Sequence, residues 1–372
     1  MKIAFVYDAV FPWVMGGAQK RVWELASRLS ERHDVHWYGQ KYWDDNDTIK
    51  REGVTLHGVC EPKDLYVDDR RSIKQALYFT LNLIPEIVGN DYDVIDCQEF
   101  PYFPCYVSLV SSVFKDTNLF ITWYEVWGDY WYDYLGNLGL GGKLIESSIA
   151  RFSATHITTS QITQDDLIEL GAKDTRVSPL GIDFEELRDV DPVEENIDLL
   201  FGARLIPEKN AELFVESVAK IIERGDDIEA LIIGEGPERE NIGRRISELK
   251  IEDSVEVIDF VDHDEFLGYI KAADVFAFPS QREGFGLVGL EALACGTPVV
   301  TSNHPQNAAQ ELIEHARTGY ICEIDSEDLA TKLTKAKSID SQACREFAKG
   351  YDWDEIATEM ESYYHEAVST TR

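Results

Sequence analysis

The chain has 372 residues, of which 44% are hydrophobic, and a formal net charge of -34 from 69 acidic and 35 basic side chains. This length favours two domains, each large enough to bury a core of its own. Nucleic acid is excluded as a partner, because phosphate backbones are bound by clusters of Lys and Arg and the sequence contains no such cluster.

The N-terminal residues predict a strand, a glycine loop and a helix. Lys2 to Tyr7 is an apolar run rich in strand-forming residues, and Ala18 to Leu29 places its apolar residues at helical spacing. The loop between them contains Gly16 and Gly17 without the G-x-G-x-x-G pattern, so a dinucleotide fingerprint is absent. The segment is typical of the start of a Rossmann-like domain, and the alternative for the glycine pair is a flexible turn.

The chain up to residue 180 alternates further strands and helices. This alternation predicts a parallel sheet with helices on both faces. The apolar run Tyr102 to Phe114 is too short to span a membrane and predicts a buried core helix. The other expected elements are the strands Asp34–Tyr38, Val54–Val59, Tyr92–Cys97, Leu119–Trp123 and Ile157–Ser160 and the helices Ile73–Val88 and Ile162–Leu170.

An aromatic stretch follows directly after one of these strands. Seven of the twelve residues from Trp123 to Tyr134 are aromatic, and seven of the eight tryptophans of the chain lie before residue 132. Aromatic rings stack on sugar faces and lie readily at membrane interfaces. The stretch therefore indicates an acceptor-binding role for the first domain, and the alternative is a hydrophobic plug that closes one end of the sheet.

An acidic segment, Asp183 to Asn196, contains Pro192 and predicts a linker between the domains. The second domain then starts with a strand, Ile197 to Phe201. Arg204 and Lys209 follow it in a loop that leads into a helix. Two cations at a helix start suit a diphosphate; the alternative is an exposed pair beside acidic neighbours.

The strands Ala230–Ile233, Val255–Val261 and Pro298–Thr301 continue the alternating pattern in the second domain. The loop Gly234–Pro237 follows the first of them. A final helix is expected over Trp353 to Val368.

The segment Pro279 to Val300 carries the most specific motif of the chain. A loop with Glu283, Gly284, Phe285 and Gly286 leads into a helix that begins near Leu287 and carries Glu291. A helix N-terminus presents unpaired N–H groups to an anion, whereas a carboxylate accepts hydrogen bonds and so fits sugar hydroxyls. The segment predicts a pocket for a sugar attached to a phosphate; the alternative is a tight turn alone.

The Glu-x7-Glu spacing around Gly-Phe-Gly resembles the signature of glycosyltransferase family 4, and the resemblance extends over nearly the whole chain. It implies the GT-B architecture, an α/β fold of two Rossmann-like doubly wound parallel-sheet domains that face each other across a cleft. The implied domains are residues 1–180 for the acceptor, residues 197–350 for the donor, and a C-terminal helix, 351–372, that crosses back to the first domain. The implied reaction transfers a sugar from a nucleotide diphosphate sugar to a hydroxyl acceptor with retention of configuration.

The resemblance also assigns roles to residues of this sequence. The cations that stabilise the leaving diphosphate would be Arg204 and Lys209, and Glu283 would contact the donor sugar. Family members carry a His after the strand that ends at Trp123, where this chain has Tyr124. The implied donor-binding residues are Gly16, Gly17, Gly236, Val261, Gly284, Phe285, Gly286, Leu287 and Glu291.

Two other functions stay open at this point. A nucleotide-sugar epimerase or phosphorylase would share the fold, and it would act on the nucleotide sugar without this acceptor. A non-catalytic, nucleotide-sugar-binding partner subunit is suggested by Tyr124, because a phenol is a poor base near neutral pH.

The resemblance implies no cofactor, with the nucleotide sugar as co-substrate, and no metal ligand is expected. The acceptor would be a glycan or a lipid-linked glycan of the cell surface. The dispersed acidity is typical of halophilic archaea, whose proteins stay hydrated in concentrated salt. We expect a cytoplasmic protein. Residues 1–180 carry 17 basic and 26 acidic side chains, so this less acidic part is the one expected to touch the inner face of the cell membrane.

Overall fold

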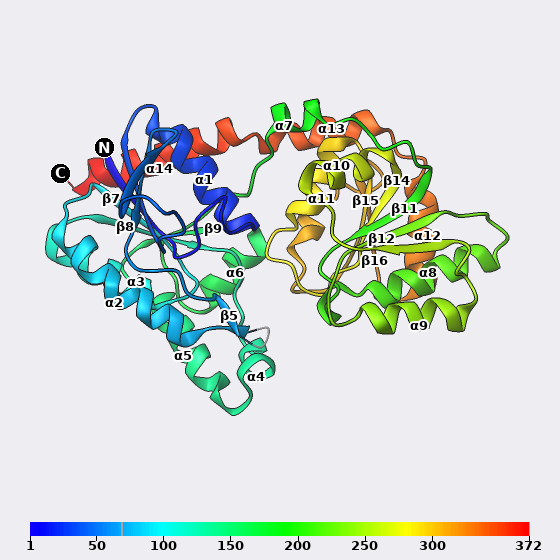
Figure 1. Ribbon diagram of the computed structural model, residues 1–372, viewed down its shortest axis with the longest axis horizontal. Coiled ribbons are helices and arrows are strands. Elements are labelled where there is room, and N and C mark those ends of the chain that lie inside the picture. The colour runs from blue at the N-terminus through cyan, green and yellow to red at the C-terminus, as the bar shows by residue number, and fades with distance from the viewer. Residues whose placement is uncertain (68–69, 372) are drawn as a thin grey trace. The chain divides into compact units, whose positions relative to one another are not determined.

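The computed structural model describes residues 1–67 and 70–371. The chain forms two compact units, one from Met1 to Leu180 together with the C-terminal segment from Trp353, and one from Gly181 to Asp352 (Figure 1). Each unit contains a parallel sheet between layers of helices, as the alternating pattern predicts.

The first unit is built on an eight-stranded sheet of order β10-β9-β8-β7-β1-β2-β4-β3, in which β3 alone is antiparallel to its neighbour. Its strands are β1 (Lys2–Val6), β2 (Asp34–Gly39), β3 (Thr48–Arg51), β4 (Val54–Gly58), β7 (Val94–Gln98), β8 (Asn118–Trp123), β9 (Thr155–Thr158) and β10 (Thr175–Val177), and a small ribbon pairs β5 (Tyr66–Val67) with β6 (Arg70–Arg71). Its helices are α1 (Gly17–Ser30), α2 (Ile73–Gly89), α3 (Phe103–Lys115), α4 (Tyr130–Leu135), the 3-10 turn η1 (Gly136–Leu138), α5 (Gly139–Ile149), α6 (Gln161–Glu169) and α14 (Trp353–Thr371).

The second unit has a six-stranded parallel sheet of order β13-β12-β11-β14-β15-β16. Its strands are β11 (Ile197–Gly202), β12 (Ala230–Ile233), β13 (Val255–Ile258), β14 (Ala273–Phe278), β15 (Val299–Ser302) and β16 (Gly319–Cys322). Its helices are α7 (Phe184–Asp189), α8 (Ala211–Glu223), α9 (Arg239–Leu249), α10 (His263–Ala272), α11 (Leu287–Cys295), α12 (Ser326–Ala336) and α13 (Ser341–Ala348), with 3-10 turns η2 (Pro207–Lys209), η3 (Ala308–Leu312) and η4 (Lys349–Tyr351).

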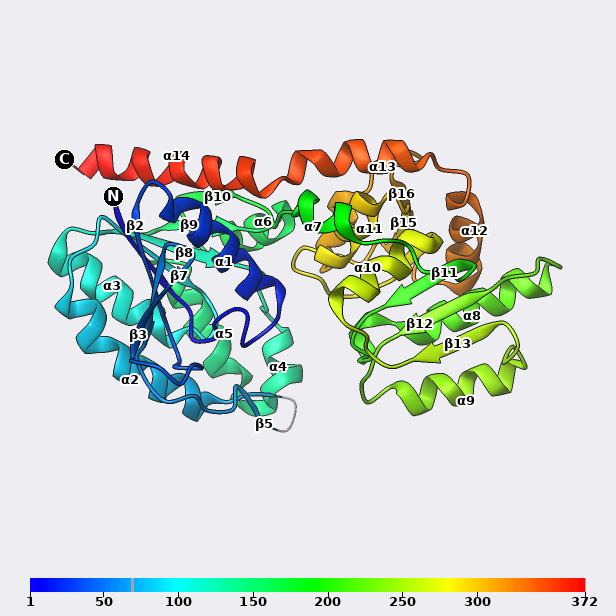
Figure 2. The ribbon, with the colours of Figure 1, turned by 45° about the horizontal axis from the view of Figure 1, so that its top comes forward.

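The C-terminal helix α14 covers the same face of the first sheet as α1 (Figure 2). The buried Tyr364 hydroxyl donates a hydrogen bond of 2.6 Å to Asp96 of β7, and its ring meets Phe120 of β8 edge to face. At the helix surface, Arg28 of α1 pairs with Asp354 at 2.6 Å. The helix is therefore fixed to the first unit by both buried and exposed contacts.

Two segments differ in detail from what the sequence predicts. The expected linker contains a helix, α7, because the Asp183 carboxylate accepts hydrogen bonds from the backbone N–H groups of Glu185 and Glu186 and caps the helix. The apolar run that predicted a core helix forms α3, but Phe114 is 83% exposed and Val113 is 73% exposed. A continuous apolar run does not show which of its sides faces the core.

A buried ion pair that the sequence did not predict lies beyond the end of β1. The Arg71 guanidinium donates two hydrogen bonds, of 2.5 and 2.6 Å, to the Asp8 carboxylate, and Gln75 donates a third at 2.9 Å. The side chains of Asp8 and Arg71 are 0% and 6% exposed. Burial opposes the charge on Arg71 most strongly, but the Asp8 carboxylate together with the hydroxyls of Tyr7 and Tyr66 outweighs it and raises the pKa of the guanidinium.

Removing one member of this pair is expected to be costly. Arg71→Met should lower the free energy of unfolding by about 3–5 kcal/mol, because it leaves a buried carboxylate without its cation. Urea denaturation followed by far-ultraviolet circular dichroism measures the change. Arg317→Met is the matched control, since Arg317 and its partner Glu314 are 50% and 45% exposed and such a pair contributes at most about 1 kcal/mol. Equal losses in the two variants would contradict the assignment.

Candidate active site

The strand order of the second unit changes direction between β11 and β14. In open parallel sheets, ligands bind beyond the carboxyl ends of the strands at such a point. Arg204 follows β11 and is exposed, and Glu283 follows β14. The topology of this unit therefore brings these two predicted residues, 79 positions apart in sequence, to the same edge of one sheet.

Lys209 and Glu283 form an ion pair at this edge. The Lys209 ammonium contacts Oε1 of Glu283, and the two side chains are 21% and 11% exposed. The ammonium also lies 5.7 Å from the centre of the Phe278 ring, at the end of β14. Glu283 therefore partly neutralises the charge of Lys209. Arg204 and the N-terminus of α11 would supply the rest of the positive charge that attracts a diphosphate bound here.

Backbone hydrogen bonds fix the loops that carry this pair. Gln281 N–H donates to the Glu208 carbonyl at 2.8 Å, which joins the loop after β14 to the turn η2. Glu283 N–H donates to the Gln306 carbonyl at 3.0 Å, and Ala308 N–H donates to the Glu283 carbonyl at 2.9 Å. Glu283 is thus held on both sides of its backbone by the segment 306–308.

The turn before α11 requires glycine. Gly286 has φ 90°, in the left-handed region, and a Cβ atom on it would lie 2.6 Å from the Cβ of Ala309. Phe285 beside it is buried, with its ring centre 6.0 Å from that of Tyr351. The turn therefore brings its backbone, from Gly284 to Leu287, close to the space in front of α11.

Glu291 lies one turn into α11 and is only 6% exposed. The Nε2 atom of His263, at the start of α10, lies 3.6 Å from Glu291 Oε1 and 3.8 Å from Glu186 of α7. His263 is a contact that the sequence did not predict, since no spacing relates it to the Glu-x7-Glu motif.

Two further predicted donor residues lie on loops of the same unit. A Cβ atom on Gly236 would lie 2.3 Å from the Leu205 carbonyl oxygen, and Leu205 N–H donates to the Glu235 carbonyl at 2.7 Å. The glycine loop is therefore paired with the segment that follows Arg204. Val261 comes after β13, at the edge of the sheet beyond β12, and so lies farther from the switch point.

The remaining predicted residues lie in the first unit. Gly16 precedes α1 and Gly17 begins it. The Tyr124 hydroxyl donates to Gln98 Oε1 at 2.7 Å and lies 3.4 Å from the Ala18 carbonyl oxygen. The structure thus brings Tyr124 to the first turn of α1, beside the glycine pair.

The surroundings of Tyr124 are buried and acidic. Burial raises the pKa of its hydroxyl well above the usual 10. Burial likewise raises the pKa of the Glu99 carboxyl, which accepts a hydrogen bond from Tyr124 N–H at 3.3 Å. Tyr124 is therefore equipped to donate a hydrogen bond and not to remove a proton.

The aromatic stretch is packed in part. Trp123 and Trp131 are 0% and 5% exposed, whereas Tyr132 is 44% exposed. The buried carboxyl of Glu146 accepts hydrogen bonds from the backbone N–H groups of Trp127 and Gly128, at 2.8 and 2.9 Å. These contacts favour the alternative of a packed end of the sheet for the part of the stretch around Trp123 and Trp131.

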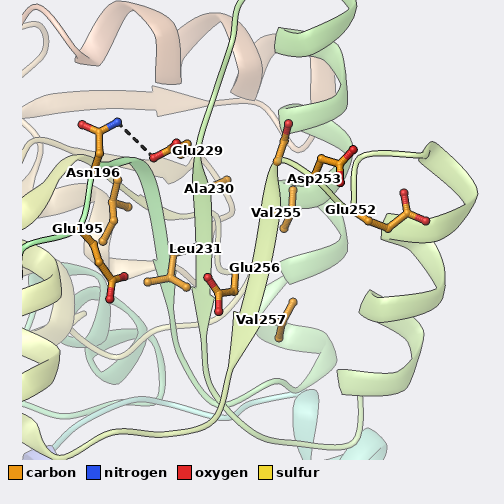
Figure 3. A pocket seen from close by; sticks show the side chains of 12 residues that line it. Glu195, Asn196, Glu229, Ala230, Leu231, Glu252, Asp253, Val255, Glu256 and Val257 are labelled. Carbon is orange, nitrogen blue, oxygen red and sulfur yellow. Dashed lines mark hydrogen bonds between the residues drawn. The ribbon is translucent and has the colours of Figure 1, made fainter.

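A cavity of the second unit lies away from this site. It has a volume of about 660 Å³ and lies at the amino ends of β11, β12 and β13 (Figure 3). Acidic side chains surround it, among them Glu195, Glu252, Asp253 and Glu256. Their charge would repel a diphosphate, so this cavity is not a donor site.

Comparison with known families decides the affiliation of the chain. Residues 15–186 match the family described as Glycosyltransferase Family 4, and residues 183–351 match Glycosyl transferases group 1. The chain belongs to glycosyltransferase family 4.

Relatives of this family 4 chain include several named transferases. It is 29% identical over 235 residues to a GDP-mannose-dependent alpha-(1-6)-phosphatidylinositol dimannoside mannosyltransferase of Mycobacterium tuberculosis, a match that covers 59% of this chain and 60% of that protein. It is 31% identical over 187 residues to the amylovoran biosynthesis glycosyltransferase AmsK of Erwinia amylovora, covering 47% of this chain and 46% of AmsK. The chain thus matches about half the length of these relatives.

Solved structures confirm the fold. Sucrose-phosphate synthase from Thermosynechococcus elongatus superposes with a TM-score of 0.76 at 18% identity, over 99% of both chains. Anabaena HepE, solved in complex with UDP-glucose, superposes with a TM-score of 0.72 at 19% identity, over 100% of both chains. The predicted α/β class with two Rossmann-like parallel-sheet domains, the GT-B fold, is confirmed.

Gly286 offers a test of the turn before α11. Gly286→Ala should destabilise the protein by about 2 kcal/mol or more, since it forces a side chain into the left-handed region and against Ala309. Thermal unfolding measures the loss. Gly289→Ala is the matched control on the same helix, where the nearest atom to a new Cβ is 3.6 Å away. If the control loses as much stability as the test variant, backbone geometry at Gly286 is not the cause.

Proposed function

We propose that this family 4 chain is a metal-independent hexosyltransferase that moves a sugar from a nucleotide diphosphate sugar to a hydroxyl acceptor, with retention of configuration. The observation that carries the proposal is the Lys209–Glu283 pair at the switch point of the second sheet, in front of the N-terminus of α11. The names of the relatives and the UDP-glucose bound to Anabaena HepE support a nucleotide-sugar donor.

In this proposal the donor residues act on charge and orientation. Negative charge collects on the diphosphate as the glycosidic bond breaks. Arg204, Lys209 and the first N–H groups of α11 would stabilise that charge, since they are already oriented before the reaction. Glu283 would accept hydrogen bonds from the hydroxyls of the donor sugar, and Glu291 from those of the ribose. This fits two carboxylates that are held beside the start of the helix.

The backbone of the glycine-containing turns would complete the donor site. Gly284, Phe285, Gly286 and Leu287 would bring N–H groups to the diphosphate, and the loops with Gly236 and Val261 would border the nucleotide. In the first unit, Gly16 and Gly17 beside Tyr124 stay predicted donor-binding residues.

For the acceptor we propose a cell-surface glycan or a lipid-linked glycan. One relative is named for a phosphatidylinositol dimannoside and another for amylovoran biosynthesis, which supports these acceptor classes without fixing one. Such acceptors are made at a membrane, so we also propose cytoplasmic localisation with contact between the first unit and the inner face of the cell membrane. Among the described residues, no helix has the length and apolar character needed to cross a bilayer.

The central prediction concerns the ion pair. Lys209→Ala and Glu283→Ala should each lower the rate of sugar transfer by at least about 100-fold, because each removes a group that meets the donor. A ligand screen by thermal shift against UDP, GDP and their sugars at high salt first identifies the donor, and product formation then measures the rate.

Lys220→Ala is the control for this experiment, since Lys220 pairs with Glu223 on the surface of α8. Its rate should equal that of the wild type. Full activity of Lys209→Ala or Glu283→Ala, with an unchanged melting temperature in all variants, would refute the proposed site. Turnover of the nucleotide sugar with no acceptor present would instead indicate an epimerase.

Tyr124 favours a second candidate, a non-catalytic partner subunit that binds a nucleotide sugar without transferring it. The hydroxyl is committed to Gln98 and its raised pKa prevents it from acting as a base. If the chain is an active transferase, as we propose, Tyr124→Phe should retain at least about a tenth of the wild-type kcat, since only one hydrogen bond is lost. Donor binding without transfer in the wild type, and transfer in Tyr124→His, would favour the subunit.

A further inference from the structure

The first unit has an exposed apolar face that its fold does not cover. The helix α2 places its exposed aliphatic side chains three or four positions apart, which aligns them along one side of the helix. They are Ile73, Leu77, Leu81, Ile84 and Val88, with exposed fractions from 40% to 66%. The opposite side of α2, with Phe79, Leu83 and Ile87, is fully buried in the core.

The neighbouring helix α3 continues this face. It packs along α2, and its Ser111 hydroxyl donates to the Ile87 carbonyl at 3.2 Å. Its exposed side chains Val110, Val113 and Phe114 are 49%, 73% and 83% exposed. Large side chains that are exposed to this degree on adjacent helices are uncommon in monomeric proteins and mark an interaction surface.

The helix α5 extends the face on the other side of α3. The Tyr106 and Ser148 hydroxyls join α3 to α5, and α2, α3 and α5 lie together in both views (Figures 1 and 2). Leu138, Leu140 and Leu144 are 54–73% exposed. We call the exposed apolar residues of α2, α3, η1 and α5 the apolar face.

A cavity opens within the apolar face. It has a volume of about 290 Å³, and its lining is largely apolar, with Phe100 and Trp131 in its wall. Ile73 and Leu138 line the cavity and also belong to the apolar face. The face therefore includes a recess that a hydrocarbon chain can enter.

Acidic side chains are nearly absent from the two helices that carry most of the apolar face. The 17 residues of α2 and the 13 residues of α3 contain a single acidic side chain, Glu86, in a chain with 69 acidic residues among 372. The basic residues of these helices, Lys74 and Lys115, lie at their outer ends, and Lys115 pairs with the exposed Asp91 at 2.7 Å. The sequence omits acids from the apolar face although it places them nearly everywhere else.

We propose that the apolar face docks on a lipid bilayer, with α2 and α3 parallel to its surface. Interfacial helices combine an aliphatic side with lysines that reach the headgroups from the rim. A protein partner fits less well, because binding energy at protein interfaces concentrates in Trp, Tyr and Arg, and Leu and Val are under-represented there. The inference deepens the membrane contact of the proposed function and names its surface, which includes the aromatic stretch only through Trp131 and Tyr134 in the wall of the cavity.

The test is a flotation assay with phosphatidylcholine vesicles in about 1 M salt. Electrostatic attraction is screened within about 3 Å at that ionic strength, whereas apolar insertion is not weakened. The wild type should float with the vesicles. The variant Leu81→Glu/Phe114→Glu should bind at least tenfold more weakly, since both side chains are highly exposed and their replacement leaves the core intact.

The matched control is Ile168→Glu/Ile324→Glu, which also exchanges two large apolar side chains, 49% and 40% exposed, for acids outside the apolar face and outside the proposed donor site. It should bind vesicles within twofold of the wild type. Failure of the wild type to float, or equal losses in both double variants, would overturn the proposal. A lipid-free dimer that becomes monomeric in Leu81→Glu/Phe114→Glu would overturn it too, in favour of a second copy of the chain. Nucleotide binding by thermal shift, followed in the same samples, distinguishes these failures from failure of the transferase assignment.

Discussion

The candidate site depends on the hydrogen bonds that hold Glu283 between β14 and the segment 306–308. The anchor of that segment is the Asn307 side-chain amide, which is fully buried and donates to Thr301 Oγ1 and to the Ser302 carbonyl, both at 2.9 Å. These bonds tie the loop to the end of β15, so the position of the carboxylate follows from the register of the sheet. A buried, fully satisfied amide is costly to displace. The ion pair with Lys209 is then formed by two rigid loops.

The fold was largely predictable because its periodic elements bury one side. The helix expected over Ala18–Leu29 is α1, and the strands expected near residues 197, 230 and 255 are β11, β12 and β13. The prediction failed where the sequence pattern does not show which side of an element faces the core. The run that forms α3 is apolar except for Ser108, Ser111 and Ser112. The packing against α2 and the sheet buries the side with these serines, so that Phe114 faces outward. The acidic segment before β11 became a helix through one capping carboxylate, Asp183, which composition alone does not reveal.

For the site, local motifs were predictable and tertiary partners were not. Glu283, Gly286 and Glu291 lie within one short stretch whose spacing is a family signature, and Gly286 has the positive φ that such a turn requires. His263 and Asn307 have no such spacing, since they reach the motif only through the order of the strands. The Arg71–Asp8 pair is equally invisible, because its members are 63 residues apart and meet through burial alone.

The acidic composition that excludes nucleic acid as a partner also makes the apolar face stand out from the rest of the surface. In a chain of net charge -34, acids are spread over nearly the whole sequence in spite of their mutual repulsion, so a surface of exposed aliphatic residues with one acid departs from the general pattern. Exposure of Leu81 and Phe114 to water would be unfavourable in concentrated salt, where apolar association is not weakened by screening. Occupancy by a bilayer removes that cost. It would also place the first unit beside acceptors that are carried by lipids, while the acidic remainder of the chain stays in solvent.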